Sequence, residues 1–423
     1  MKMIITYLQS FLNRSGGYIF SATIFARLFS FLTSWVALQL IPNKALGSVL
    51  YAWNIITFLI PLIGAGLHLS YIRYGALTTN TKDREQLLYY ILKYGILVSV
   101  LITVIIFFTG IYAPFDIIGS GIYLSAFSFV LLPMFLVEVI KIKLRLHHKN
   151  KKLAITEIVY TLLLFCFTVL LSYFFAEKGY ITAVVLAPIC TVAIFFREII
   201  SGFKKQSKPK VITLAFWKFG IIGSLSNVAT IFLFAIDILL IGQLLKVPEL
   251  ITSYRYISLI PFSMLFLPRV FITTDFVSFT EKINTTSYIK SYIKSYLLLF
   301  TLISLVFILF TYLFSFQILT FLDPMFTEYT DSFLILNMGV CGILIFRGLF
   351  GNLLSSIGLV NINLMITIIA VLLNYSSNYQ LIPILGLKGA CITSAIVMWF
   401  TGIASAISFV IGYKKYLLTL KKT

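Results

Sequence analysis

The chain has 423 residues, of which 60% are hydrophobic and 11% are charged. Soluble domains carry roughly 45–50% apolar and about 25% charged residues, so this composition excludes an ordinary soluble domain. A net charge of +19 would favour a nucleic-acid partner for a soluble protein. Here the positive charge lies in the gaps between apolar segments, and we expect no nucleic-acid partner.

The apolar residues are gathered in segments of about 20 residues, the length needed to cross a hydrocarbon core of about 30 Å. Runs such as Ile96 to Phe108 do not alternate apolar and polar residues, which excludes the strands of a membrane β-barrel. The pattern predicts an all-α polytopic membrane protein with about 12 transmembrane helices. The expected helices lie near 17–41, 47–71, 87–112, 117–140, 153–176, 180–200, 214–245, 251–275, 288–319, 331–357, 361–382 and 387–413.

Positive charge alternates between successive loops. Lysine and arginine are concentrated in the loop 141–152, the linker 204–210 and the tail 414–422, whereas the intervening loops hold at most one lysine each. Loops rich in lysine and arginine remain in the cytoplasm. The alternation therefore predicts an even number of spans with both termini in the cytoplasm.

The linker 204–210 divides the spans six and six, and we expect one six-helix bundle in residues 1–203 and another in 204–423. No predicted loop exceeds about 20 residues, which leaves no room for a separate catalytic domain. No P-loop motif occurs, and the four cysteines show no C-x-x-C spacing. We therefore expect a transporter rather than an enzyme, with neither a cofactor nor a metal.

Two arginines fall near the middle of predicted spans, where a cation costs roughly 2.5–3.5 kcal/mol on insertion scales. Arg27 and Arg347 each lie about ten residues from a span end, roughly 15 Å deep at 1.5 Å per residue. Ser30 shares the helix face of Arg27, and Asn337 can share that of Arg347. Arg255 lies about one turn from the outer end of its span. A buried ion pair or a side chain reaching the interface is the structural alternative.

The seventh span carries a polar face that includes Asn227 and Asp237 at spacings of three and four residues. Asp237 is either the partner of one of the arginines or the carrier of a coupling ion. Glu157 begins a similar stripe in the fifth span, where a carboxylate also suits the first turn of a helix. Both residues are therefore candidates for ion coupling or for charge pairing.

Together these faces predict a central cavity between the two bundles with a net positive charge. Such a cavity attracts anions, and arginine binds phosphate through two parallel hydrogen bonds. We expect a phosphate or pyrophosphate group in the substrate. The candidate substrate-binding residues are Arg27, Arg255, Arg347, Ser30, Asn227 and Asn337.

The chain resembles the Wzx-type polysaccharide repeat-unit flippases of the multidrug/oligosaccharidyl-lipid/polysaccharide exporter superfamily. The similarity covers all twelve spans, although each motif is short. It departs at Leu385, where an aromatic residue is often found, and at Thr252, where glycine is common. The residues that carry it are Leu40-Ile41-Pro42, Gly47, Gly64, Gly66, Arg73, Phe216 to Gly220, Asn227, Asp237, Ile241-Gly242 and Ile382 to Ala390.

The resemblance implies a flippase of the bacterial cytoplasmic (inner) membrane. Such proteins move undecaprenyl-pyrophosphate-linked oligosaccharide between leaflets for polysaccharide biosynthesis, including O-antigen of lipopolysaccharide and capsule. The head group would occupy the cavity while the lipid tail stays among the membrane lipids, and the halves would rock to give alternating access. Other membrane proteins of polysaccharide assembly are the implied protein partners.

Two other classes remain open. A multidrug or cation antiporter of the same superfamily would share the fold, but acidic residues would be expected at its midplane. A membrane polysaccharide polymerase or transferase would need a large outer loop with catalytic residues, whereas the longest loops here are cytoplasmic and basic.

Overall fold

The computed structural model describes residues 17–78, 80–203, 212–269, 271 and 282–420. These residues are almost entirely helical, with short turns between the helices, and contain no strand. This is the expected result for apolar segments of span length, because only a helix satisfies its backbone hydrogen bonds within one segment of lipid-exposed chain. Within these residues, eight helices are long and apolar enough to cross a membrane, or ten if two bent pairs each form one span. The all-α polytopic fold is confirmed.

The helices divide into two compact units. The N-terminal unit comprises described residues 17–232 and 246–252, and the C-terminal unit comprises 233–245 and 253–420. The predicted boundary at 203/204 adjoins the linker 204–210, which lies outside the described residues. The division into two six-helix bundles therefore stays a prediction.

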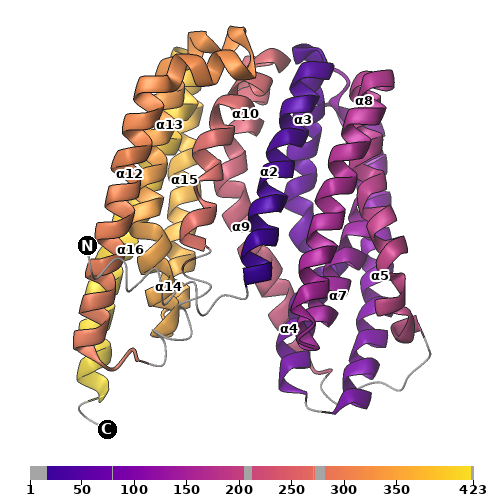
Figure 1. Cartoon of the computed structure of the whole chain (residues 1–423), viewed down its shortest axis with the longest axis vertical. Coiled ribbons are helices and arrows are strands. Elements are labelled where there is room, and N and C mark those ends of the chain that lie inside the picture. The colour runs from indigo at the N-terminus through magenta and orange to yellow at the C-terminus, as the bar shows by residue number, and fades with distance from the viewer. Residues whose placement is uncertain (1–16, 79, 204–211, 270, 272–281, 421–423) are drawn as a thin grey trace. The chain divides into compact units, whose positions relative to one another are not determined.

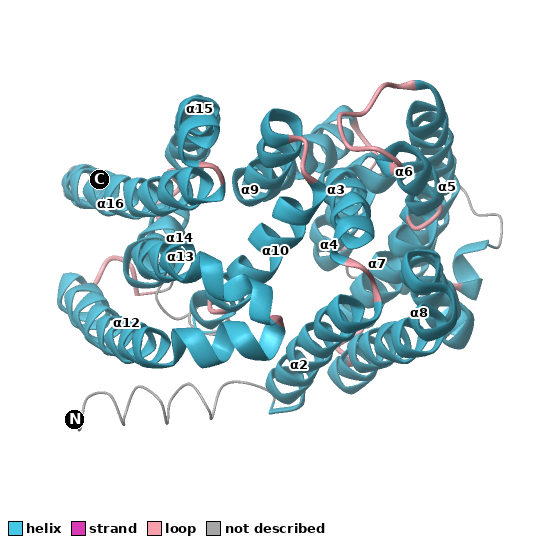
Figure 2. Ribbon diagram, turned by 90° about the horizontal axis from the view of Figure 1, so that it is seen from above, coloured by secondary structure: helices cyan, strands magenta, loops and turns pink. Residues whose placement is uncertain are grey.

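The N-terminal unit packs its first helix against its longest one, and both views show α2 lying along α8 (Figures 1 and 2). Phe29 of α2 meets Phe165 of α8 edge to face, with ring centroids 5.3 Å apart. The helices are α2 (Gly17–Leu40), α3 (Asn43–Leu59), η1 (Ile60–Gly66), α4 (Leu67–Leu77), α5 (Thr81–Tyr112), α6 (Ser120–Ser128), α7 (Leu131–Leu146), α8 (Asn150–Phe195), η2 (Phe196–Glu198), η3 (Ile200–Phe203) and the first part of α9 (Leu214–Leu245).

In the C-terminal unit, α16 packs against both α13 and α15 (Figure 2). Its core includes the wholly buried rings of Phe300, Phe326 and Phe333. The helices are the second part of α9, α10 (Pro248–Ser263), whose first residues belong to the N-terminal unit, α12 (Thr286–Leu322), η4 (Pro324–Tyr329), α13 (Thr330–Gly342), a π-helical segment (Ile343–Arg347), α14 (Gly348–Ser356), α15 (Val360–Leu385) and α16 (Leu387–Leu420).

The 46-residue helix α8 reverses direction at Ala176, whose φ of 47° and ψ of −125° lie outside the helical region. A Cβ on Gly179 would lie 2.0 Å from the Leu171 carbonyl oxygen, although eight residues of straight helix span about 12 Å. The turn between α15 and α16 repeats this geometry at Gly386 (φ 58°, ψ −138°), with Gly389 beside Leu381. The described residues hold ten candidate spans when each bent pair is counted as one. Counting α8 as two spans and adding α2 brings the number to about the dozen predicted.

A second pair of equivalent positions lies in the N-terminal unit. The Thr252 hydroxyl donates to the Asn43 carbonyl at 2.8 Å, and Gly47 approaches the Pro248 carbonyl so closely that a Cβ would lie 1.9 Å from its oxygen. Asn43 and Pro248 are separated by the same number of residues as Gly47 and Thr252. The two contacts therefore join equivalent sequence positions, as expected for a chain with an internal repeat.

The second predicted span is broken at its centre by η1. Ile63 is extended (ψ 137°), and Gly64, Ala65 and Gly66 all have positive φ, between 50° and 72°. For Ala65 this conformation costs roughly 1–2 kcal/mol, because its Cβ crowds the following carbonyl. A Cβ on Gly66 would lie 2.2 Å from the Gly220 carbonyl oxygen of α9. The break therefore brings the α4 and α9 backbones together.

We expect Gly66→Ala to destabilise the protein by about 2–4 kcal/mol, since it adds a left-handed φ penalty to overpacking against α9. Gly119→Ala is the matched control, because Gly119 also has a positive φ (81°) but only a ring carbon of Tyr123, at 3.8 Å, near its Cβ position. Thermal unfolding of the purified variants measures the difference. Equal losses of stability would show that α9 does not depend on Gly66.

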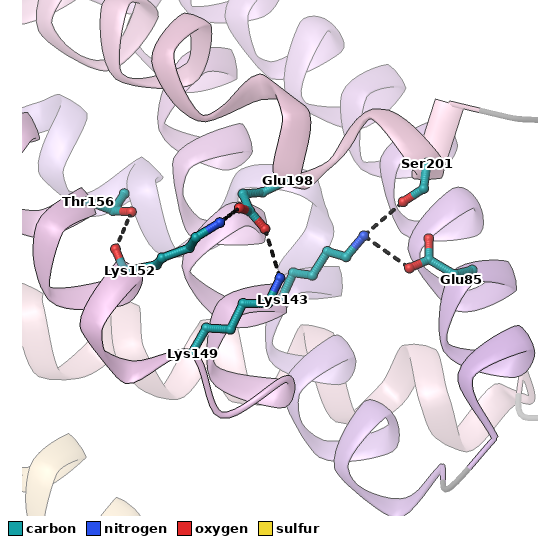
Figure 3. Close-up of polar contacts among 7 residues, drawn as sticks. All are labelled: Glu85, Lys143, Lys149, Lys152, Thr156, Glu198 and Ser201. Carbon is teal, nitrogen blue, oxygen red and sulfur yellow. Dashed lines mark hydrogen bonds and ion pairs between the residues drawn. The ribbon is translucent and has the colours of Figure 1, made fainter.

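The segment 141–152, predicted as a basic loop, is helical on both sides of a short turn at 147–149, and three of its lysines make the polar contacts drawn in Figure 3. The Lys143 ammonium lies 3.0 Å from Glu85 of α5 and donates to the Ser201 hydroxyl at 2.8 Å. Glu198 accepts from Lys152 at 2.6 Å and from Lys149 at 3.5 Å. Partly exposed pairs of this kind contribute about 0.2–1 kcal/mol each, so their main effect is to fix η3 against α5 and α7, and η2 against the start of α8.

Candidate substrate and ion sites

The clearest candidate for an anion site is Arg347 in the C-terminal unit. Arg347 ends the π-helical segment between α13 and α14, a local widening that occurs frequently at functional sites. One terminal nitrogen of its guanidinium donates to Asn363 Oδ1 at 3.1 Å and to Ser405 Oγ at 2.6 Å. The other donates to Thr367 Oγ1 at 3.0 Å. The side chain is therefore held in one orientation by α15 and α16.

All three acceptors of Arg347 are neutral. Asn363 is itself oriented, because its amide nitrogen donates to the Gly351 carbonyl and to Ser355 Oγ, which turns its oxygen toward the guanidinium. No carboxylate forms an ion pair with Arg347 among the residues that the structure describes. Arginine has five N–H donors, and three hydrogen bonds to neutral groups leave its charge uncompensated. The arrangement can bind an anion.

Asp237 occupies a wholly buried position on α9, where side chains from three other helices converge. Its carboxylate accepts from the hydroxyls of Tyr254 and Ser394, and from the Asn378 amide at 2.6 Å. Asn378 also donates to Asn374 one turn earlier on α15. These donors are all neutral, so they bring no positive charge to the buried carboxyl group.

Oxygen atoms dominate the surroundings of Asp237. The Asn378 carbonyl oxygen is buried without a hydrogen-bond partner in the described structure, and oxygens of Asn374 and Ser394 lie in the same hydrogen-bonded set. No described group of three or more histidine, cysteine or acidic side chains could hold a metal ion. A single carboxylate among neutral oxygens suits a proton or a singly charged hard cation rather than a transition metal.

The contacts of Asp237 bear on the two roles that the sequence left open for it, an ion pair with an arginine or the binding of a coupling ion. Its described hydrogen bonds are with neutral groups, and none is with an arginine or a lysine. Arg255 follows Tyr254 on α10 and is half-buried, with no ion pair in the described part of the chain. Glu157, by contrast, lies 3.0 Å from the Lys141 ammonium, which also meets Glu138 at 3.0 Å.

The remaining candidates differ in exposure. Asn337 is buried in α13, where its amide nitrogen donates to the Phe333 carbonyl at 2.9 Å, so its side chain supports its own helix. In the N-terminal unit, Arg27, Ser30 and Asn227 are exposed. The Ser30 hydroxyl donates to the Ala26 carbonyl at 2.8 Å. That these residues share one cavity with Arg347 stays a prediction.

The side chains that hold Arg347 and Asp237 were not among the site residues predicted from the sequence. The available signal was the repetition of polar side chains at helical spacing in the last two spans. The residues it would have marked are Asn363, Thr367, Asn374, Asn378, Ser394 and Ser405.

The fold is similar to those of solved transporters. An inward-facing multidrug resistance MATE-family transporter of the MOP superfamily is 14% identical, with a TM-score of 0.71 over 94% of this chain and 96% of that one. The lipid II flippase MurJ, in an inward closed conformation, is 15% identical, with a TM-score of 0.71 over 95% of this chain and 90% of its own.

A third structure is a MOP-superfamily transporter from Pyrococcus furiosus Vc1, 15% identical, with a TM-score of 0.62 over 98% of this chain and 96% of that chain. No protein-family model and no curated protein sequence matches the chain. At these identities the likeness establishes the fold, which is that of the MOP-superfamily transporters.

We expect Tyr254→Phe to destabilise the protein by about 1.5–3 kcal/mol, because it removes a hydrogen bond to a buried charged group. Tyr296→Phe is the control: its hydroxyl is also buried but donates to a neutral carbonyl, of Leu344, at 3.2 Å, and its loss should cost about 1 kcal/mol. Adding Asp237→Asn to Tyr254→Phe should restore part of the loss. Thermal unfolding of the single and double variants measures the coupling, and simple additivity would contradict it.

Proposed function

We propose that this protein is a flippase for an anionic, lipid-linked oligosaccharide, with an undecaprenyl-pyrophosphate head group as its substrate. The observation that carries the proposal is the guanidinium of Arg347, which is oriented by three neutral acceptors and lacks a carboxylate partner in the described structure. A charge kept uncompensated inside an apolar protein is costly. A phosphate that binds it during transport supplies the missing negative charge.

The mechanism follows from the chemistry of such a substrate. A pyrophosphate cannot cross hydrocarbon unaided, whereas a polyprenyl tail need not leave it. Arg347 would bind the phosphate through its free N–H groups, with Arg27 and Arg255 as further cationic contacts. Ser30, Asn227 and Asn337 would supply neutral hydrogen bonds. Asp237 would bind the coupling ion, a proton or sodium, whose release on the other side resets the transporter.

The fold supports this proposal in general terms. One structural neighbour is named as a flippase of lipid II, and others are multidrug transporters. The resemblance to Wzx-type flippases, carried by short motifs along the chain, favours an oligosaccharide over a drug. We place the protein in a bacterial inner membrane with both termini in the cytoplasm.

A multidrug cation exporter is the second candidate, and one observation favours it. Asp237 is a buried carboxylate whose described partners are neutral, so an organic cation could also be attracted to it. The same unit holds Arg347, which would repel such a ligand. The two candidates therefore predict opposite outcomes when Arg347 is neutralised.

We expect Arg347→Gln to abolish complementation of surface polysaccharide in a strain lacking this gene, while Arg347→Lys retains part of it. Lysine keeps the charge but loses the planar fork that binds phosphate. Arg145→Gln, at an exposed arginine in the last turn of α7, is the control for loss of charge alone. Protein levels are measured alongside, because removing a cation from a span should not impair insertion.

Full complementation by Arg347→Gln at normal expression, combined with increased export of a cationic dye, would show that the protein is a multidrug exporter and not a flippase.

The proposed orientation has its own test. Labelling with a membrane-impermeant maleimide from outside whole cells should modify Lys178→Cys but not Lys149→Cys, since the basic loop is expected in the cytoplasm. Both lysines are exposed. The four native cysteines, of which Cys166 is exposed, must first be replaced. The reverse labelling pattern would invert the topology.

A further inference from the structure

An aromatic cluster joins α5 to the first turn of α9 in the N-terminal unit. The Trp217 ring centroid lies 6.3 Å from that of Tyr90 and 6.4 Å from that of Tyr94. Tyr90 and Tyr94 are one turn apart on α5, with ring centroids 4.5 Å apart. All three side chains are only partly buried. Two helices that are distant in the sequence therefore form one aromatic surface.

The hydroxyl of Tyr90 is oriented by Trp217. The indole Nε1 of Trp217 donates to the Tyr90 oxygen at 3.2 Å. A tyrosine hydroxyl can accept and donate at the same time. Within the described residues the Tyr90 O–H donates to no other group, so it remains available as a donor.

Two exposed lysines flank these rings. The Lys93 ammonium lies 5.5 Å from the centroid of the Tyr94 ring, within the range of a cation–π contact. Lys218 directly follows Trp217 on α9. The ion pairs among the described residues involve neither lysine. We call these five residues the α5–α9 cluster: Tyr90, Lys93, Tyr94, Trp217 and Lys218.

The α5–α9 cluster lies at the depth of a membrane interface. Helix α5 ends at Tyr112, and the helix from Lys93 to Tyr112 is about 28 Å long, close to the hydrocarbon thickness of about 30 Å. The start of α5 lies beside the basic segment 141–152, because Arg84 donates to the Leu146 carbonyl at 3.4 Å. Lys93 therefore falls at the interface on the side of the basic segment, and interfaces are where tryptophan and tyrosine are enriched.

Apolar side chains continue from the cluster along both helices. Leu97 and Leu101 are exposed in the next two turns of α5, and Ile222 and Leu225 are exposed in the next two turns of α9. Basic sites between spans bind anionic lipid head groups. Cations at the interface, with exposed apolar faces beyond them, are complementary to a lipid that carries a negative head group and acyl chains.

We propose that the α5–α9 cluster binds an anionic phospholipid of the surrounding bilayer. The phosphodiester oxygens accept hydrogen bonds from the ammonium groups of Lys93 and Lys218 and from the Tyr90 O–H. The acyl chains lie along the exposed faces of α5 and α9. This lipid is a resident ligand, distinct from the transported lipid-linked substrate.

The bound lipid would act on the helix that the two units share. Helix α9 begins in the N-terminal unit and ends in the C-terminal unit. A head group that contacts both Lys93 and Lys218 holds the start of α9 against α5. The anionic lipid content of the membrane would thereby influence how firmly this helix is anchored in the N-terminal unit.

Trp217 supplies the probe for a direct test, because bromine on a lipid acyl chain quenches a neighbouring tryptophan. The chain contains four tryptophans, and replacing Trp35, Trp53 and Trp399 by phenylalanine leaves the Trp217 signal alone. The full-length protein is placed in phosphatidylcholine nanodiscs that contain either brominated phosphatidylglycerol or brominated phosphatidylcholine at the same fraction. We expect phosphatidylglycerol to be enriched about fivefold or more beside Trp217.

The Lys93→Gln, Lys218→Gln double variant should lose this enrichment, since it removes both cations of the cluster. Lys151→Gln, Lys178→Gln is the matched control. It removes the same charge from two exposed lysines of the same unit that form no ion pair among the described residues, and it should keep the enrichment.

Thermal unfolding of each variant checks that it is folded. If the three tryptophan replacements impair folding, the difference between the unmodified protein and Trp217→Phe gives the same quenching signal.

Equal quenching of Trp217 by the two brominated lipids overturns the proposal. It is also overturned if the enrichment survives in the Lys93→Gln, Lys218→Gln variant, or is lost to the same extent in the control. The measurement needs no transported substrate, so its outcome is independent of whether the protein is a flippase.

Discussion

Burial of charge in an apolar interior is the constraint on which this structure depends. Water is absent from a hydrocarbon core, and a charged side chain there must obtain all its hydrogen bonds from the protein. The C-terminal unit meets this requirement for Asp237 and Arg347 by surrounding them with neutral amides and hydroxyls. In the N-terminal unit, the partly exposed Lys141 is paired with Glu138 and Glu157 instead.

This difference has a functional meaning. A pair of opposite charges is self-sufficient and has little affinity for a further ion, whereas a charge oriented by neutral groups still attracts a counterion. Asn363 and Asn378 have the same part in the two C-terminal sites: each is held by a second polar group and presents one end of its amide to the charge. The helices α15 and α16 contribute side chains to both sites, so ligand binding at one site can alter the other site through these two helices.

The sequence predicted the spans closely because each is decided by local composition, and the ends of α2 and α9 fall within a residue of expectation. Arg347 and Asp237 were identifiable for the same reason, as charges inside apolar segments. Their partners could not be identified from the sequence. Serines such as Ser394 and Ser405 are common in spans, and their contacts with the charged side chains depend on how helices that are distant in the chain pack together.

The assignment of residues 246–252 to the N-terminal unit has a consequence for biosynthesis. The contacts of Thr252 with Asn43, and of Pro248 with Gly47, close the N-terminal unit. Ribosomes deliver the chain in order, so this unit cannot complete its packing until part of the second half has been synthesised. A gene split at the linker 204–210 would leave the first fragment without residues 246–252. The second fragment would then have to supply the first part of α9 and the start of α10 to the N-terminal unit.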